Sequence, residues 1–167
     1  TEQHRYDVTG YFALKSAYGN AQDFMTFVNE MHKDGISVIL DFPVTFFQKT
    51  ETGLACYDGS CLYEYADPAK AMQPGTDRLI FDYGRKQVTN YLLSCALFWI
   101  ENFHIDGFRL TDISKALYLD SDRKPGEWTP NIYGGNENLE AVDFVKHLVS
   151  MVNKVVPGLL MLTKETA

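Results

Sequence analysis

The stretch from Gln87 to Leu110, QVTNYLLSCALFWIENFHIDGFRL, decides the fold class of this chain. Its first part, 87–103, has apolar side chains at helical spacing, at Val88, Leu92 and Cys95 among others, which predicts an amphipathic helix. The second part, 104–110, is a short apolar run of the kind that forms a strand buried on both faces. A helix that leads directly into a buried strand is typical of parallel α/β structure.

The same helix-then-strand unit is predicted on each side of this stretch. Asn20 is a good N-cap for a helix that carries Phe24, Phe27, Val28 and Met31 and ends at Gly35, and the apolar run 36–42 follows it. A third helix is predicted for 137–155, with Pro157 and Gly158 ending it and a strand at 159–162. The apolar stripe of this third helix is Leu139, Val142, Val145, Leu148, Val149 and Val152.

Long connections follow the first two predicted strands, at 43–85 and after Leu110, whereas the connections before the strands are short. In (β/α)8 barrels the loops after the strands build the functional site, so function is expected there. Three strands cannot close a barrel of eight, and open apolar edges are a liability. We therefore predict one domain over 1–167, a partial (β/α)8 TIM barrel of about strands 3 to 5. Its open edges would be covered by the rest of a longer barrel or, less favoured, by copies of itself.

Composition excludes several classes of function. Fifteen basic against twenty-two acidic residues give a formal charge of −7, which disfavours nucleic acid as a partner. No long apolar segment or secretory signal is visible, so no membrane association is expected and the cytoplasm is favoured. Cys56, Cys61 and Cys95 are expected to be free thiols, with a Cys56–Cys61 bridge as the alternative. Neither a metal-binding spacing nor a cofactor motif is visible, so no cofactor or metal is predicted.

A set of short motifs occurs in one order along nearly the whole chain, and together they resemble the catalytic barrel of 1,4-α-glucan (glycogen) branching enzymes in the α-amylase superfamily. The stretches around Trp128 and Gly134 favour branching enzymes over amylases. The motifs include Tyr6-Asp-Val-Thr-Gly-Tyr-Phe-Ala, Ser16-Ala-Tyr-Gly, Val38-Ile-Leu-Asp, Leu62-Tyr-Glu, Leu79-Ile-Phe-Asp-Tyr-Gly-Arg, Ile105-Asp-Gly-Phe-Arg, Gly126-Glu-Trp-Thr-Pro-Asn and Gly134-Gly-Asn-Glu-Asn-Leu-Glu-Ala.

The resemblance implies a catalytic site at the ends of three strands, but key positions are substituted. On the third barrel strand Asp41 matches the family's Asp, while Phe46 stands where a sugar-contacting His is expected. On the fourth strand Arg109 is kept, while Thr111 replaces the nucleophilic Asp. On the fifth strand Lys164 replaces the Glu that acts as general acid. With Thr111 and Lys164 at these positions, an ion pair with Asp41 is the expected role of Arg109.

A retaining glycosyl transfer needs one carboxylate as nucleophile and a second carboxyl as acid. A threonine hydroxyl without an activating base is a poor nucleophile, and a lysine of ordinary pKa is a poor acid. The chain is therefore predicted to be a pseudoenzyme. The alternative is that β-bulges turn Asp112 and Glu165, each one residue further on, into the vacant positions.

Three aromatic residues are candidates for contacts with an α-glucan. Tyr6 matches a family tyrosine that stacks on sugar, and Trp128 and Tyr133 lie in a loop after a strand; packing within the protein is the competing interpretation for each. Two further hypotheses therefore accompany the resemblance to branching enzymes. The protein either binds glucan or serves as a scaffold without catalysis, or it is a purely structural or interaction module.

Overall fold

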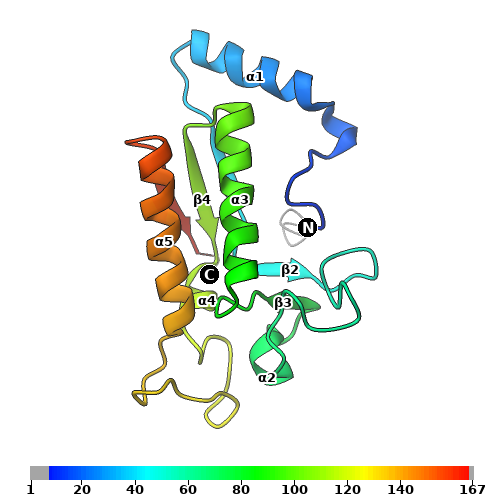
Figure 1. Cartoon of the computed structure of the whole chain (residues 1–167), viewed down its shortest axis with the longest axis vertical. Coiled ribbons are helices and arrows are strands. Elements are labelled where there is room, and N and C mark those ends of the chain that lie inside the picture. The colour runs from blue at the N-terminus through cyan, green and yellow to red at the C-terminus, as the bar shows by residue number, and fades with distance from the viewer. Residues whose placement is uncertain (1–7, 166–167) are drawn as a thin grey trace.

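The fold is built on a three-stranded parallel sheet covered on one side by helices. The computed structural model describes residues 8–165. Strands β1 (Ile39–Phe42), β4 (Gly107–Thr111) and β5 (Leu160–Lys164) lie in the order β1-β4-β5. Helices α3 (Lys86–Phe103) and α5 (Leu139–Val155) lie side by side in front of this sheet, and α1 (Ala21–Lys33) crosses beyond one end of it (Figure 1). This is the predicted helix–strand alternation.

Local sequence signals set the ends of the helices. At the start of α1, the side chain of Asn20 accepts hydrogen bonds from the backbone N–H groups of Gln22 and Asp23, and Asp23 accepts from the N–H of Asn20. This reciprocal capping box satisfies N–H groups that have no partner within the helix. Helix α3 ends at His104, whose left-handed φ of 54° stops the helix before β4.

The two faces of the parallel sheet are unequally covered. Phe42, Phe108 and Leu110 lie on the helix side and are buried. Alternate residues point to the opposite face, where Ile39, Leu160 and Leu162 are 39%, 47% and 41% exposed. Among the described residues β1 and β5 thus have one open face, because the helices pack against the other face only.

Residues 43–85, expected to have no regular structure, contain a second small sheet. Strands β2 (Phe46–Gln48) and β3 (Arg78–Ile80) pair antiparallel, and the short helix α2 (Pro68–Ala71) lies between them in sequence. Three-residue strands are too short to show a period in the sequence, which is why the pattern was missed. Two further short helices, η2 (Ser16–Tyr18) and α4 (Ser114–Leu117), complete the fold.

The buried stripe of α5 also differs from the prediction. Its fully buried residues are Ala141, Phe144, Leu148 and Val152, a stripe that shares only the last two with the expected one. The ring of Phe144 stacks on Tyr83, with ring centroids 5.2 Å apart. Anchoring this large side chain rotates the contact face of the helix toward it.

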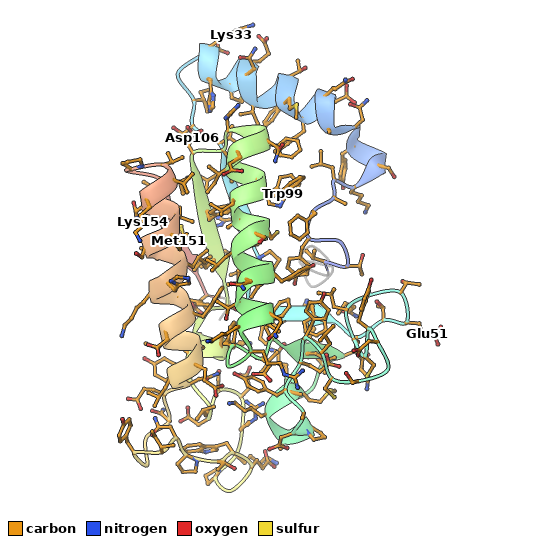
Figure 2. The ribbon with its side chains drawn as sticks, in the orientation of Figure 1. Lys33, Glu51, Trp99, Asp106, Met151 and Lys154 are labelled. Atoms are coloured by element: carbon orange, nitrogen blue, oxygen red, sulfur yellow. The ribbon has the colours of Figure 1, made fainter. Side chains whose placement is uncertain are left out.

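Trp99 lies in the core and links α3 to the segment before α1. Figure 2 shows Trp99 on the side of α3 that faces this segment. Its indole Nε1 donates to the carbonyl of Tyr11 at 2.9 Å, and the thiol of Cys95 donates to the same oxygen. The ring of Trp99 also packs on Phe24 and Phe103. The N-terminal part of the described chain is thereby fixed against the barrel helices.

The end of the sheet opposite the long loops is held by Asp106, next to the connection between α1 and β1 (Figure 2). Its carboxylate accepts the backbone N–H of Val38 at 2.6 Å and contacts Nε2 of His32 at 2.8 Å.

Candidate functional site

The residues singled out on the strands gather at the ends where long loops begin. In Figure 1 the arrow of β4 points toward β2, β3 and the long connections. The register pairs Asp41 with Arg109 and Thr111 with Lys164, so these four side chains leave the sheet on one face. We call this group the strand-end site. It lies at the carboxyl end of a parallel sheet, where barrel proteins place their chemistry.

Asp41 and Arg109 form a two-pronged ion pair across β1 and β4. Nε of Arg109 donates to Oδ1 of Asp41 at 2.5 Å, and a second guanidinium nitrogen donates to Oδ2 at 2.7 Å. The predicted ion pair is present, with both groups half-buried. Bidentate geometry of this kind fixes the orientation of the guanidinium plane beside Thr111.

Thr111 and Lys164 stand next to each other on β4 and β5. The backbones of such neighbouring parallel strands are about 4.7–4.9 Å apart. Thr111 is 5% exposed on the central strand, whereas Lys164 is exposed on the edge strand. The two positions are thus neighbours across the sheet, with a hydroxyl and an ammonium where the resemblance implies two carboxyls.

The alternative in which Asp112 and Glu165 supply these carboxyls is wrong in this structure. The register of β4 and β5 runs without interruption from Gly107–Leu160 to Thr111–Lys164, which leaves no bulge in either strand. Asp112 lies past the end of β4, with a left-handed φ of 52° and its N–H bonded to the carbonyl of Lys164. The carboxylate of Glu165 instead binds the backbone N–H and the hydroxyl of Ser114.

Phe46 is the first residue of β2 and is buried. The resemblance implies a sugar-contacting histidine at this position. Its backbone carbonyl accepts the hydroxyl of the buried Tyr11 at 2.9 Å, and its strand partner is Ile80. A phenyl ring has no donor or acceptor for a sugar hydroxyl. Tyr6, the candidate stacking residue, lies outside the described residues.

Trp128 and Tyr133 share a loop but have different surroundings. Trp128 is half-buried and lines a cavity of about 560 Å³ between α2, α4 and the loop 118–138. Tyr133 is 82% exposed and does not line this cavity. The structure therefore separates two residues that the sequence grouped together. The other walls, including Tyr65, Arg123 and Glu140, were not anticipated, because no residue pattern marks them.

The three cysteines are free thiols, and burial raises the pKa of Cys95 to about 12. Over residues 8–165, no helix is long and apolar enough to cross a bilayer. The same residues contain no group of three or more His, Cys, Asp or Glu side chains arranged to hold a metal ion.

Comparison with known proteins agrees with this architecture. The family model of the α-amylase catalytic domain matches residues 1–53. Two solved α-amylases share the fold: a maltogenic enzyme from Thermotoga neapolitana, with a TM-score of 0.66 at 17% identity, and the Geobacillus thermoleovorans enzyme complexed with acarbose, with 0.65 at 18%. The matches cover 95% and 96% of this chain, and 31% and 32% of those chains.

Curated relatives are closer in sequence. The chain is 50% identical to the 1,4-α-glucan branching enzyme of Synechococcus sp. (strain JA-3-3Ab) over 96% of its length, and 46% identical to that of Chlamydia pneumoniae over 99%. It covers 21% and 23% of these relatives, so it spans between a fifth and a quarter of their length. The fold is thus part of a (β/α)8 barrel, and the chain belongs to the α-amylase superfamily, with a sequence of the 1,4-α-glucan branching enzyme type.

Proposed function

We propose that this chain is a part of a glucan-handling barrel of the branching-enzyme type that does not itself catalyse glucan transfer. The observation that carries the proposal is the pairing of Thr111 with Lys164 at the strand ends. The resemblance implies a nucleophilic and an acidic carboxyl at these two neighbouring positions, and neither holds a carboxyl. We also propose that 1–167 forms one domain with further barrel strands, since the exposed Ile39, Leu160 and Leu162 would then be covered.

Both halves of a double displacement depend on carboxyl groups. The first half needs a carboxylate that attacks the anomeric carbon and a carboxylic acid that protonates the leaving oxygen. The second half needs the acid's conjugate base to activate the incoming hydroxyl. A hydroxyl at Thr111 forms no such covalent intermediate without a base to deprotonate it, and an ammonium at Lys164 leaves no base for the return step.

An activity measurement tests the proposal directly. The purified protein, in the full form in which the cell makes it, is incubated with amylose, and new α-1,6 branches and new reducing ends are counted. The Synechococcus relative is run in parallel as the active control. We expect neither branches nor reducing ends above a protein-free blank. Branching or hydrolysis by the protein would overturn the proposed inactivity.

A second candidate function is a purely structural or interaction role without glucan binding. Phe46 favours this role over a site that keeps all its sugar contacts, because its phenyl ring has no donor or acceptor for a sugar hydroxyl. Isothermal titration with maltoheptaose separates the two candidates. Glucan handling predicts a saturable heat of binding, and a purely structural role predicts none.

A further inference from the structure

Two thiols outside the strand-end site share one surface turn in the connection 43–85. Cys56 is exposed and Cys61 is partly exposed, whereas the third thiol, Cys95, is buried. Glu51, in the same loop, lies at the outer edge of the molecule (Figure 2). We propose that Cys56 and Cys61 are a redox modification site, at which a hydroperoxide oxidises the two thiols to a reversible disulfide. This chemistry needs no glucan and is independent of the proposed function.

The two thiols belong to a segment whose ends are fastened together. The N–H of Gly59 donates to the carbonyl of Cys56 at 2.8 Å, so the chain makes a reverse turn here. The rings of Tyr57 and Tyr63, on the two sides of this turn, meet edge to face with centroids 6.1 Å apart. The backbone N–H of Cys56 donates to Oε1 of Glu64 at 3.0 Å. Both thiols therefore lie within one small closed loop.

The second half of this loop is anchored to the core. Glu64 forms an isolated bridge with Phe81, which is fully buried, and the guanidinium of Arg85 donates to the carbonyl of Leu62 at 3.3 Å. Cys61 directly precedes this anchored stretch. A disulfide needs its two Cβ atoms within about 3.5–4.5 Å of each other. Because only the turn separates the two thiols, their approach requires a shift of the turn and leaves the core in place.

Glu64 contacts one of the two thiols and not through its backbone. It is a buried carboxylate, 3% exposed, and its Oε1 accepts the S–H of Cys56 at 3.6 Å in addition to the backbone N–H. Its Oε2 is buried and makes no hydrogen bond within residues 8–165. Among these residues, both donors to the carboxylate therefore come from Cys56.

This contact gives the two thiols different reactivity. Hydrogen bonding to Glu64 raises the pKa of Cys56 most, and the charges of Glu64 and Cys61 add to the effect, so Cys56 stays protonated. The thiol of Cys61 makes no hydrogen bond to another described residue. The thiolate is the form that reacts with peroxide. Cys61 is therefore the thiol that is oxidised first, and Cys56 is the thiol that attacks it afterwards.

The oxidation proceeds in two balanced steps. The thiolate of Cys61 attacks one peroxide oxygen, an S–O bond forms, the O–O bond breaks, and the leaving oxygen takes up the proton that Cys61 released. The sulfur of Cys56 then attacks the sulfenic sulfur of Cys61, the S–S bond forms, the S–O bond breaks, and hydroxide leaves as water with the proton of Cys56. Two thiols and one hydrogen peroxide thus give one disulfide and two waters.

The contact with Glu64 also makes the disulfide easy to reduce. Oxidation of Cys56 removes its S–H and leaves the buried carboxylate with one donor fewer, which raises the free energy of the oxidised form. Disulfides that are exposed or energetically costly are the labile ones, and a dithiol opens them by thiol–disulfide exchange. In a reducing compartment such a pair is oxidised only transiently, as in redox sensors.

Trypsin provides a direct readout of the pair. It cuts after Lys49 and Lys70 and leaves both thiols on the peptide 50–70, while Cys95 falls on the peptide 87–109. The full protein is treated with millimolar hydrogen peroxide, remaining thiols are alkylated under denaturing conditions, and the peptides are weighed. We expect the peptide 50–70 to lose two hydrogen atoms and escape alkylation, and Cys95 to be alkylated. Dithiothreitol, added after the peroxide is removed, should restore both thiols.

Variants test the part assigned to each side chain, after circular dichroism confirms that each one folds. Cys56→Ser should leave Cys61 as a sulfenic acid that dimedone traps, whereas Cys61→Ser should leave Cys56 mostly unreacted. Glu64→Gln removes the negative charge beside Cys56 and should speed both its alkylation at pH 7 and disulfide formation about threefold or more. Asp58→Asn is the matched control, since this carboxylate of the same turn binds Ser60, and both rates should stay within about twofold.

Three results would overturn these assignments. A peptide 50–70 that keeps both thiols, or that carries sulfinic acids without a disulfide, would overturn the redox site. Trapping of dimedone on Cys56 in Cys61→Ser, with none on Cys61 in Cys56→Ser, would reverse the order of the two thiols. Equal rates for Glu64→Gln and the unaltered protein would remove Glu64 from the site. Absence of glucan binding or branching changes none of these readings.

Discussion

Thr111 and Lys164 are register partners on adjacent parallel strands, and both side chains leave the sheet on the same face. The central strand buries the first, while the edge strand exposes the second. Because the two positions form one pair, a change at either alters the immediate surroundings of the other. Restoring one carboxyl alone would supply only half of a two-carboxyl mechanism.

Because Thr111 and Lys164 form one pair, we expect glucan cleavage to require a carboxyl at both positions. Thr111→Asp and Lys164→Glu, made singly, should leave glucan cleavage at the level of the blank. The double variant should produce measurable reducing ends from amylose, at a rate below that of the Synechococcus relative because Phe46 still lacks a polar group for the sugar. Equal activity of one single variant and the double variant would contradict the pairwise argument.

The ion pair of Asp41 with Arg109 should contribute measurably to stability. Asp41→Ala removes both hydrogen bonds and leaves the half-buried guanidinium without this carboxylate, so we expect a loss of about 1.5–3 kcal/mol in the free energy of unfolding. Urea titration followed by circular dichroism measures it. Asp143→Ala, an exposed carboxylate on α5, is the control and should change stability by less than about 0.5 kcal/mol. A loss no larger than the control would show that the pair contributes nothing.

Gly107 is required where β4 approaches β5. A Cβ at this position would lie 2.6 Å from the carbonyl oxygen of Leu160 and 2.8 Å from its Cβ. The obstacle is neighbouring backbone, so Gly107→Ala should force the strands apart and cost about 1–3 kcal/mol or more. Thermal unfolding is the measurement. Gly10→Ala, where the added Cβ would make only an ordinary 3.5 Å contact with Ala13, should leave the melting temperature nearly unchanged.

Stability should fall in alkaline solution because buried groups keep their protons in the folded state. Burial raises the pKa of Cys95 to about 12, against about 8.5 in an unfolded chain. Between these values the unfolded chain releases a proton that the native protein retains, so stability is complete below the lower pKa and decreases as pH rises. The slope for one such group is at most about 1.4 kcal/mol per pH unit. Buried Tyr11 and Tyr83, whose pKa values are also raised by burial, act in the same direction at higher pH.

Urea titrations between pH 8 and 9 test the contribution of Cys95, since unfolded tyrosines, with a pKa of about 10, keep most of their protons there. Cys95→Ala should flatten the fall in stability over this window, whatever its effect at pH 7. Cys61→Ala removes a partly exposed thiol and should keep the slope of the unaltered protein. Identical slopes for all three proteins would exclude Cys95 as the source.

Removal of the Arg123 side chain should loosen the loop 118–138. Arg123→Ala loses the hydrogen bonds to backbone carbonyls of this loop and of the α2 segment, and charged hydrogen bonds contribute about 1.5–3 kcal/mol. Chymotrypsin cleavage at Trp128 and Tyr133 should then accelerate about tenfold or more, if cleavage follows the population of the open loop. Lys124→Ala, the adjacent exposed cation, is the control, and cleavage of both variants at one rate would contradict the role of Arg123.

Much of the strand-end site could be predicted from the sequence, because it depends on features that the sequence displays. The period of two places Arg109 and Thr111 on one face, and the order of the motifs aligns Asp41 and Lys164 beside them. The cavity could not be predicted in this way. Its walls depend on Arg123 bonding to backbone carbonyls, and a carbonyl is present at every residue, so no pattern of residue types marks its partners.

The small sheet was missed for a different reason. Three-residue strands show at most one full alternation, and Phe46 and Phe47 are both buried, so no alternation of apolar and polar residues exists to detect. The stripe of α5 was misplaced because tertiary packing of Phe144 on Tyr83, not the count of apolar residues, selects the face that is buried.

The hydrogen bond from Trp99 to the carbonyl of Tyr11 joins residues 88 positions apart in the chain. During synthesis at about 5–20 residues per second, Tyr11 therefore waits about 4–18 seconds for its partner to be added. During that interval the core that buries the ring of Tyr11 is incomplete. Helix α1 has been synthesised, but α3, the helix against which it packs, has not. Final burial of the N-terminal segment is thus a late event in the biogenesis of this protein, and until then the nascent chain exposes the apolar surface that Tyr11 and α1 later cover.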